Sequence, residues 1–343
     1  AFKIRLPEMA GGTVTHASLY SNAEVGIYEE GEQYFFDSYF TDCSIKALRE
    51  RKGDRPLLLN ATYFAPHPPL DIPEPWFSRV KEGSFSLPDN VGVFSDGQSP
   101  LQLYNLPGYV GSRYDRSHWL EAWRVYLGLV SLLDDMVARL IGELKDQGLY
   151  DESVILFTSD HGEMLGSHAL FQKMCMYEES TRIPLSFKMP ASMAVKPTVI
   201  DEAVSNIDVM PTLCELLQLK VRQTFDGQSL LSLITSQKTQ DSKRPIFIQF
   251  DGNGARGNFQ RCVVHDGYKL IVDLFKDEVF YELYHLASDP QEQHNLLFEA
   301  SYDERGADLY SMLATHMEAT GDLLHLDGFD ATEFRVRYGR GHL

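Results

Sequence analysis

The sequence has only four cysteines, Cys43, Cys175, Cys214 and Cys262, scattered along its 343 residues. This spacing gives no disulfide framework, so a small disulfide-stabilised class is excluded. No uninterrupted apolar run approaches the roughly 20 residues that a bilayer crossing requires. The sequence therefore predicts no membrane span.

The chain also lacks an initiator Met, because it begins at Ala1. We interpret it as a fragment, a processed product or the product of a truncated gene. For the same reason, the sequence does not decide whether the protein has a signal peptide. It also leaves the compartment and the oligomeric state undecided.

Positive charge is scarce. The sequence holds 31 Lys and Arg against 49 Asp and Glu, which gives a formal net charge of -18. Such a surface argues against nucleic acid or an anionic membrane as the partner. It does not exclude a small anionic substrate, because a metal ion and one Lys at a site outweigh distant charges that salt screens.

Strands and helices alternate along the first part of the chain. The patterns predict helices over residues 41–50, with Thr41 as the cap, and over 118–147. They predict strands over 57–63, 153–158 and 185–188. Residues 1–35 are weakly patterned and expected to be irregular, and residues 80–115 are expected to lie at the mouth of a substrate site. The inner face of the long helix is expected to hold Trp123, Leu127, Val130, Leu133, Val137, Leu140 and Leu144.

The period changes after a polar, linker-like stretch at 235–244. Alternating residues predict antiparallel strands over 245–250, 260–265, 268–273 and 278–286, with a helix over 301–318 covering one face. This pattern predicts an α/β domain over residues 1–240 and a smaller C-terminal α+β subdomain over 241–343. The Arg-containing tail after Asp327 is expected to be solvated.

The most informative stretch runs from Thr158 to Lys173. Asp160, His161 and His168 follow a short apolar strand, and Lys173 closes the run. Ligands bind at the carboxyl ends of strands in open α/β sheets. Each residue alone fits a solvated loop, but together they favour a site for a metal ion and an anion.

The run TSDHGEMLGSHALFQKMCMYEESTRIP, residues 158–184, resembles the second metal-binding stretch of the sulfatases, members of the alkaline phosphatase superfamily. Four further stretches agree in order and spacing: LLLNATYFAPHPP at 57–69, DVMPTLCELL at 208–217, GYKL at 267–270 and ELYHLASDPQEQHNL at 282–296. The resemblance implies an α/β fold with an alkaline-phosphatase-like, mostly parallel sheet flanked by helices. It also implies a metal-dependent hydrolase of small-molecule or saccharide sulfate esters.

By this resemblance, Asp160 and His161 are metal ligands, and His67 and Lys173 are catalytic residues that bind the substrate anion. His168 is a weaker candidate, which either lines the substrate site or holds the loop by bonding a backbone carbonyl. Family analogy favours Ca²⁺, but an imidazole ligand suits Mn²⁺ or Zn²⁺ better, so both stay as alternatives. Asp134 and Asp135 form an acidic pair within the long helix, which we interpret as structural because adjacent helical residues point to different sides.

Sulfatases resembling this chain carry a Cys-x-Pro/Ala-x-Arg motif whose Cys becomes the formylglycine nucleophile. None of the four cysteines is followed by this motif, and no Ser-based version is present. We therefore expect this chain alone to be inactive. A phosphonate or phosphate ester hydrolase of the same superfamily and a non-catalytic remnant stay as alternatives.

Overall fold

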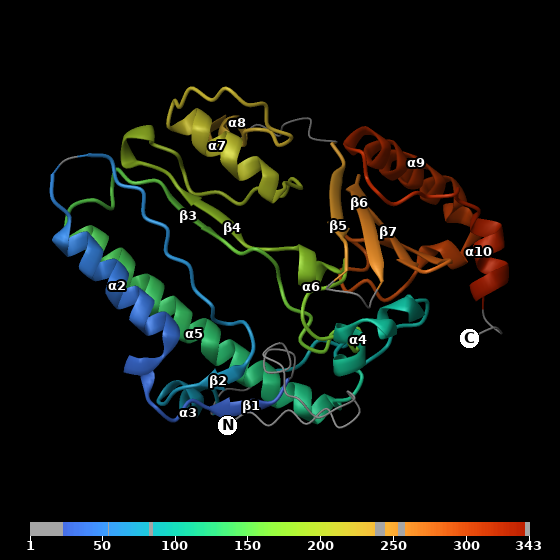
Figure 1. The fold of residues 1–343 in the computed structure, drawn as a ribbon, viewed down its shortest axis with the longest axis horizontal. Coiled ribbons are helices and arrows are strands. Elements are labelled where there is room, and N and C mark those ends of the chain that lie inside the picture. Colours follow the sequence, from blue (N-terminus) through green and yellow to red (C-terminus); the bar gives the residue numbers. More distant parts are fainter. Residues whose placement is uncertain (1–22, 54, 82–84, 237–243, 253–257, 340–343) are drawn as a thin grey trace.

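The computed structural model describes residues 23–53, 55–81, 85–236, 244–252 and 258–339 (Figure 1). Residues 1–22 of the segment 1–35 that was expected to be irregular lie outside them, and so do residues 237–243 of the predicted linker. Within the described residues 23–35, the expectation was wrong at Val25–Ile27, which form a strand. The described first part contains β1 (Val25–Ile27), α2 (Phe36–Glu50), β2 (Leu70–Ile72), α3 (Trp76–Lys81), α4 (Leu106–Gly111), α5 (Arg116–Asp146), β3 (Ile155–Thr158), α6 (Glu178–Thr181), β4 (Leu185–Lys188), α7 (Val209–Leu216) and α8 (Leu231–Ser236).

Helices α2 and α5 pack side by side (Figure 1). The prediction for α2 was wrong at its start, because the helix begins five residues earlier and Thr41 donates to the carbonyl of Asp37 inside it. The prediction for α5 was right in extent, and its inner face was right at Leu140 and Leu144, which are buried. It was wrong nearer the start of the helix. Leu127 and Val130 are exposed, and a neighbouring apolar stripe is buried instead: Trp119, Ala122, Val125, Leu129, Leu132 and Met136.

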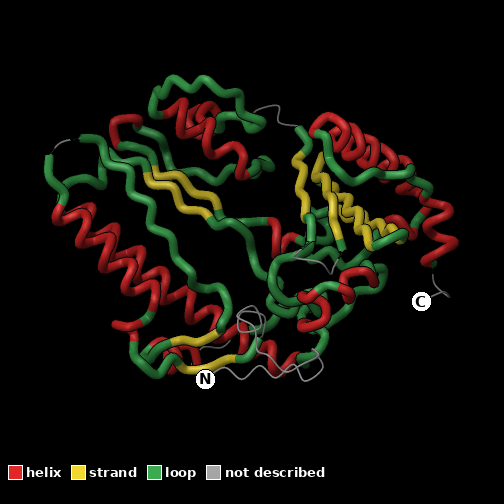
Figure 2. Tube along the Cα trace, viewed as in Figure 1, coloured by secondary structure: helices red, strands yellow, loops and turns green. Residues whose placement is uncertain are grey.

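The sheets of the first part are small, as the tube in Figure 2 shows. β1 pairs with β2 in parallel, and β3 pairs with β4 in antiparallel fashion. Residues 57–63 form no strand, contrary to the prediction. Strand geometry needs a neighbouring strand to accept its hydrogen bonds, and the amides that follow this segment, those of Phe64 and Ala65, bond to the Asp37 carboxylate instead.

The C-terminal subdomain matches its prediction closely. Four antiparallel strands are ordered β5 (Ile246–Phe250), β6 (Phe259–His265), β7 (Tyr268–Phe275) and β8 (Glu278–His285). The turn between β6 and β7 uses Asp266 and Gly267, both at positive φ, as a tight hairpin requires. Helix α9 (Asp303–Thr320) packs against β6 and β7, and α10 (Ala331–Tyr338) follows it (Figure 1).

Both faces of this sheet are covered. One alternate set of side chains, including Val263 and Leu270, packs under α9 and α10. The opposite set, including Cys262 and Ile271, packs against the loop that follows β3. The sequence predicted the first cover but not the second, which joins the subdomain to the candidate site.

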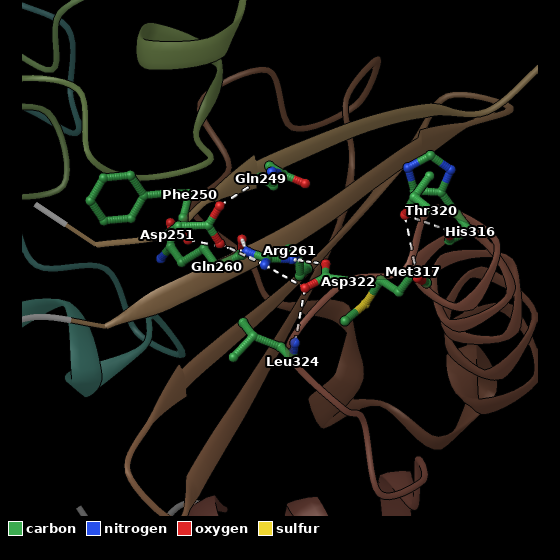
Figure 3. A network of polar contacts seen from close by, with 10 residues as sticks. All are labelled: Gln249, Phe250, Asp251, Gln260, Arg261, His316, Met317, Thr320, Asp322 and Leu324. Atoms are coloured by element: carbon green, nitrogen blue, oxygen red, sulfur yellow. Dashed lines mark hydrogen bonds and ion pairs between the residues drawn. The ribbon is translucent and has the colours of Figure 1, made fainter. Parts of the chain in front are cut away.

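A buried arginine connects the sheet to the end of α9 through hydrogen bonds (Figure 3). Arg261 on β6 bonds through Nε and Nη2 to Asp322, at 2.5 and 2.8 Å, and through Nη2 to Asp251 at 2.6 Å. Arg335 of the tail likewise donates two hydrogen bonds to the Asp303 carboxylate, one from each of its terminal nitrogens. The tail is therefore docked through Arg335 and α10, contrary to the prediction of a solvated tail.

The expectation for residues 80–115 was also wrong between about 95 and 105. This stretch is largely buried and supplies polar partners to two buried carboxyls of the C-terminal sheet. The Ser99 hydroxyl donates to Asp273 at 2.6 Å, and the Ser99 amide donates to Glu282 at 3.1 Å. Gln102 and Tyr177 also donate to Glu282. The two parts of the chain thus share a hydrogen-bonded interface, and the domain division at residue 240 stays a prediction.

Among the described residues, no helix combines the length and apolar character needed to cross a bilayer. Asp134 and Asp135 are exposed on α5, as expected of a structural pair.

Candidate active site

Two segments far apart in the sequence supply the candidate site. One is the loop after residue 63, which carries His67, and the other is the loop after β3, which carries Asp160, His161 and Lys173. The Nζ atom of Lys173 lies 2.6 Å from Nε2 of His67. The rings of His67 and His161 have their centroids 6.1 Å apart. The structure therefore brings these four predicted residues together.

The tautomer of His67 follows from its two contacts. Its Nδ1 lies 2.7 Å from the carbonyl oxygen of Pro68, so Nδ1 carries the proton and donates it. Nε2 then holds a lone pair and accepts from the Lys173 ammonium. Burial lowers the pKa of His67, and the positive charge of Lys173 lowers it further. His67 is thus neutral at neutral pH, with its reactive nitrogen fixed toward Lys173.

Lys173 is half-buried. Burial lowers its pKa, and the carboxylates of Glu163 and Asp160 oppose this effect. Glu163 is a residue that the sequence analysis did not select. Burial raises its pKa to about 7, and its Oε1 accepts from the amides of Leu165 and Gln172. Glu163 therefore shapes the loop that ends at Lys173.

The position of His67 depends on another residue that was missed. Asp37, buried in α2, accepts from the backbone amides of Phe64 at 2.8 Å and Ala65 at 2.6 Å. Burial raises the pKa of Asp37, and these two amides lower it. Nothing in the sequence marked this Asp, because it lies 27 residues before its first partner in an otherwise ordinary amphipathic helix.

Asp160 and His161 offer two donor atoms for a cation. Nδ1 of His161 donates to the Gly162 carbonyl at 2.9 Å, which leaves a lone pair on Nε2. That Nε2 lies 3.4 Å from Oδ2 of Asp160, whose side chain is 84% exposed. The described part of the chain brings no group of three or more His, Cys, Asp or Glu together in a metal-binding arrangement. The pair itself has the donor chemistry of a partial site for a divalent ion.

His168 does not join these residues. It is fully buried and stacks on Tyr177, with ring centroids 3.9 Å apart and planes 4° apart. Burial lowers the pKa of His168 to about 3, so the ring is neutral. The backbone turns inward here, because His168 and Ala169 both have positive φ. The prediction that His168 lines the substrate site is not supported, and its alternative as a loop-holding residue fits better.

The acids Glu178 and Glu179 lie in the first turn of α6, where acids favour the helix terminus and where Arg182 is a near neighbour in sequence. Instead, Glu178 forms an ion pair with Lys269 at 2.7 Å, and Glu179 accepts from the amide of Asn90 at 2.7 Å. Both partners lie on distant segments, which the sequence pattern cannot show.

Comparison with known proteins identifies the family of this chain. A family model described as "Sulfatase" matches residues 7–219. The chain belongs to the sulfatase family. A second model, described as "N-sulphoglucosamine sulphohydrolase, C-terminal", matches residues 166–319. The resemblance noted in the sequence is thereby confirmed, and with it the alkaline phosphatase superfamily.

Similar curated proteins include the multifunctional alkaline phosphatase superfamily protein PehA of Trinickia caryophylli, 29% identical over 297 residues, which cover 78% of this sulfatase chain and 57% of PehA. An arylsulfatase of Clostridium perfringens is 26% identical over 277 residues, covering 80% of this chain and 56% of that enzyme. The chain spans about half the length of the curated relatives it matches.

Two solved structures show the fold. One is a complex with the substrate D-glucosamine-2-N,6-O-disulfate, with a TM-score of 0.72, 22% identity, and coverage of 84% of this sulfatase chain and 70% of the other. The other is the phosphonate monoester hydrolase of Agrobacterium radiobacter, with a TM-score of 0.70, 22% identity, and coverage of 84% and 62%. The alkaline-phosphatase-like α/β fold is confirmed.

Proposed function

We propose that the protein is a metal-dependent hydrolase of sulfate monoesters in which His67 and Lys173 bind the sulfate group. The observation that supports this most directly is the 2.6 Å contact between Lys173 Nζ and His67 Nε2 in a member of the sulfatase family. Both atoms are nitrogens that donate hydrogen bonds when protonated, and sulfate oxygens only accept them.

An anion placed between these two nitrogens would change their protonation. Negative charge favours the charged form of a neighbouring imidazole, so a bound sulfate group would raise the pKa of His67. The proton then resides on Nε2, the atom that faces the ester. Where a nucleophile is supplied from outside this chain, it would form a bond to sulfur as the ester S–O bond breaks; the leaving oxygen would take this proton, and His67 would return to the neutral form.

The attacking group is assigned to no residue of this chain, because the sequence contains neither a formylglycine motif nor its Ser-based version. Without a nucleophile, the site only binds and polarises an ester. We therefore expect the 343-residue chain to bind anions but not to turn over aryl sulfates or aryl phosphates.

Asp160 and His161 would hold the metal ion through Oδ2 and Nε2. When bound, a divalent ion supplies positive charge beside the sulfuryl oxygens. Ca²⁺ is our first assignment, with Mn²⁺ or Zn²⁺ as the alternatives. Two protein ligands leave most coordination positions to water. We expect weak Mn²⁺ binding in calorimetry that Asp160→Ala abolishes and the exposed-carboxylate control Asp134→Ala retains. Binding that survives Asp160→Ala would place the metal elsewhere.

The anion site is tested with inorganic sulfate and the ring resonances of His67 in nuclear magnetic resonance spectra. Sulfate is expected to shift these resonances and to raise the pKa of His67 in the parent chain and in Lys196→Met, which removes an exposed lysine. The effect should vanish in Lys173→Met. Sulfate binding that persists unchanged after replacement of both His67 and Lys173 would overturn the proposal.

A phosphonate or phosphate ester hydrolase is the second candidate. It is supported by the fold shared with a phosphonate monoester hydrolase, and by the similarity to PehA. Competition between the two anions distinguishes the candidates. If methylphosphonate binds the His67–Lys173 pair with a lower dissociation constant than inorganic sulfate does, the second candidate is favoured.

A further inference from the structure

Residues 176–180 lie between the candidate site and the C-terminal sheet, and the sheet side of this segment contacts a fully buried lysine. Lys269, on β7, places Nζ 2.9 Å from the carbonyl oxygen of Met176, 2.7 Å from Oε1 of Glu178 and 2.8 Å from Oε1 of Glu292. An ammonium group has three protons. One backbone carbonyl oxygen and two carboxylate oxygens therefore surround the ammonium group of Lys269.

Glu292 completes this arrangement from the loop after β8. Its Oε2 accepts from the backbone amide of Glu178 at 2.6 Å. That amide is the first of α6 and has no partner within the helix. Burial alone would lower the pKa of Lys269, but Glu292 and Glu178 raise it above its usual value, so the lysine is charged.

The other side of the same segment holds the site. The Ser180 hydroxyl donates to the backbone carbonyl of Lys173 at 2.6 Å. The carbonyl oxygens of Ser180 and Glu179 accept from the amides of Gly162 and Glu163, both at 2.8 Å. A few residues of backbone therefore fix both the start of the loop, beside Asp160 and His161, and its end at Lys173.

We propose that Lys269 and Glu292 are positioning residues for the anion-binding site. They act from the C-terminal subdomain through residues 176–180 and set where Lys173 stands relative to His67. This inference deepens the proposed function and rests on it. It also gives a physical reason for the GYKL and DPQEQHN stretches, which lie far along the sequence from every residue of the site.

Simple stabilisation is the competing account. A buried ion pair contributes little stability compared with apolar packing of the same volume, yet removing one partner leaves an unpaired buried charge. A double variant therefore distinguishes an effect on stability from an effect on the position of Lys173. Lys269→Met leaves both Glu292 and Glu178 without their ammonium partner. Adding Glu292→Gln removes the fully buried one of these two charges but does not restore the contact with Met176.

The experiment uses the full 343-residue chain with four variants: Lys269→Met, Glu292→Gln, the double variant, and Lys276→Met as the matched control on an exposed lysine of the same subdomain. Three quantities are measured: the dissociation constant for inorganic sulfate, the exchange rates of the amides of residues 162, 163 and 178, and the melting temperature. Loss of such supporting contacts typically weakens a site by about 10- to 100-fold.

We expect sulfate affinity to fall at least about tenfold in Lys269→Met and in the double variant, and less in Glu292→Gln, with faster exchange of the three amides. The melting temperature should recover partly in the double variant while the affinity does not. Parent-like affinity and amide exchange in a folded double variant would overturn the inference. If Lys269→Met fails to fold, Glu292→Gln and the double variant decide by the same criteria.

The two proposals fail in different ways. A parent chain that binds no sulfate refutes the proposed anion site, while the amide exchange still tests whether Lys269 and Glu292 hold the loop. A parent that binds sulfate through Lys173, with variants that bind it equally well, refutes the positioning role alone.

Discussion

Replacing Gly162 with alanine is the sharpest test of how the metal-side loop is packed. A Cβ atom at this position would lie 2.0 Å from the carbonyl oxygen of Glu179, whereas real Cβ contacts essentially never fall below 3.0 Å. The atom that this Cβ would meet belongs to the backbone, and no change of rotamer can move it aside. The two segments would have to separate by about 1 Å or more, a displacement that well-packed backbone resists.

Such a separation breaks two hydrogen bonds, from Gly162 to Ser180 and from Glu163 to Glu179, each 2.8 Å long. Each is worth about 1 kcal/mol, and the overpacking adds about 1–3 kcal/mol. We expect Gly162→Ala to lower the free energy of unfolding by about 3–5 kcal/mol. Urea denaturation monitored by circular dichroism measures this change.

Gly142→Ala is the matched control. Gly142 lies within α5 and has no atom within 4 Å of an added Cβ. Alanine there should raise the free energy of unfolding by about 0.5–1 kcal/mol, because glycine loses more backbone freedom on helix formation. Equal stability of Gly162→Ala and the parent chain would refute the close approach of the two segments.

Three further predictions follow from other contacts. His168→Phe should leave the sulfate affinity and the titration of His67 unchanged, because His168 is a neutral stacked ring; a lost sulfate response in calorimetry would return it to the site. Burial raises the pKa of Glu282 to about 8, so its contribution to stability is present below its unfolded-state pKa and is lost as the pH rises to about 8; Glu282→Gln should flatten that decline in urea melts at pH 5 to 8. Arg335→Ala should cost about 1–2 kcal/mol through its paired bonds to Asp303, while Arg337→Ala, whose partner lies at 4.0 Å, should change stability by less than about 0.5 kcal/mol in the same assay.

The sequence predicted those elements whose pattern is local. Strands β5 to β8 alternate apolar and polar residues, and Asp266-Gly267 marks a hairpin, so their extents were right to within a few residues. The buried face of α5 could not be predicted in the same way. Two adjacent apolar stripes run along this helix, and packing against β2 and α3 decides which one is buried.

The same distinction between local pattern and tertiary contact applies to the candidate site. Asp160, His161 and Lys173 were predicted from the strand that precedes them and from the family resemblance, whereas His67 rested on the resemblance, because residues 57–63 form no strand. The role of Asp37 was not predicted, because it acts through backbone amides that leave no pattern in the sequence. The GYKL stretch was noted as part of the resemblance, but nothing in it showed that Lys269 contacts residues 176–180. The sequence left His168 with two possible roles, because its stacking on Tyr177 is a tertiary contact.

The buried contacts between residues 95–105 and the C-terminal sheet have a consequence for how this protein can change. Asp273 and Glu282 are fully buried and accept hydrogen bonds from Ser99, Gln102 and Tyr177. Consider a chimera in which the sheet is replaced by that of a distant relative. If the new sheet lacks these two acids, the donors of the first part would be buried without acceptors; if the first part is replaced instead, the two acids would be buried without donors. The two parts must therefore be exchanged together with the side chains that meet between them, because these contacts cross the predicted division at residue 240.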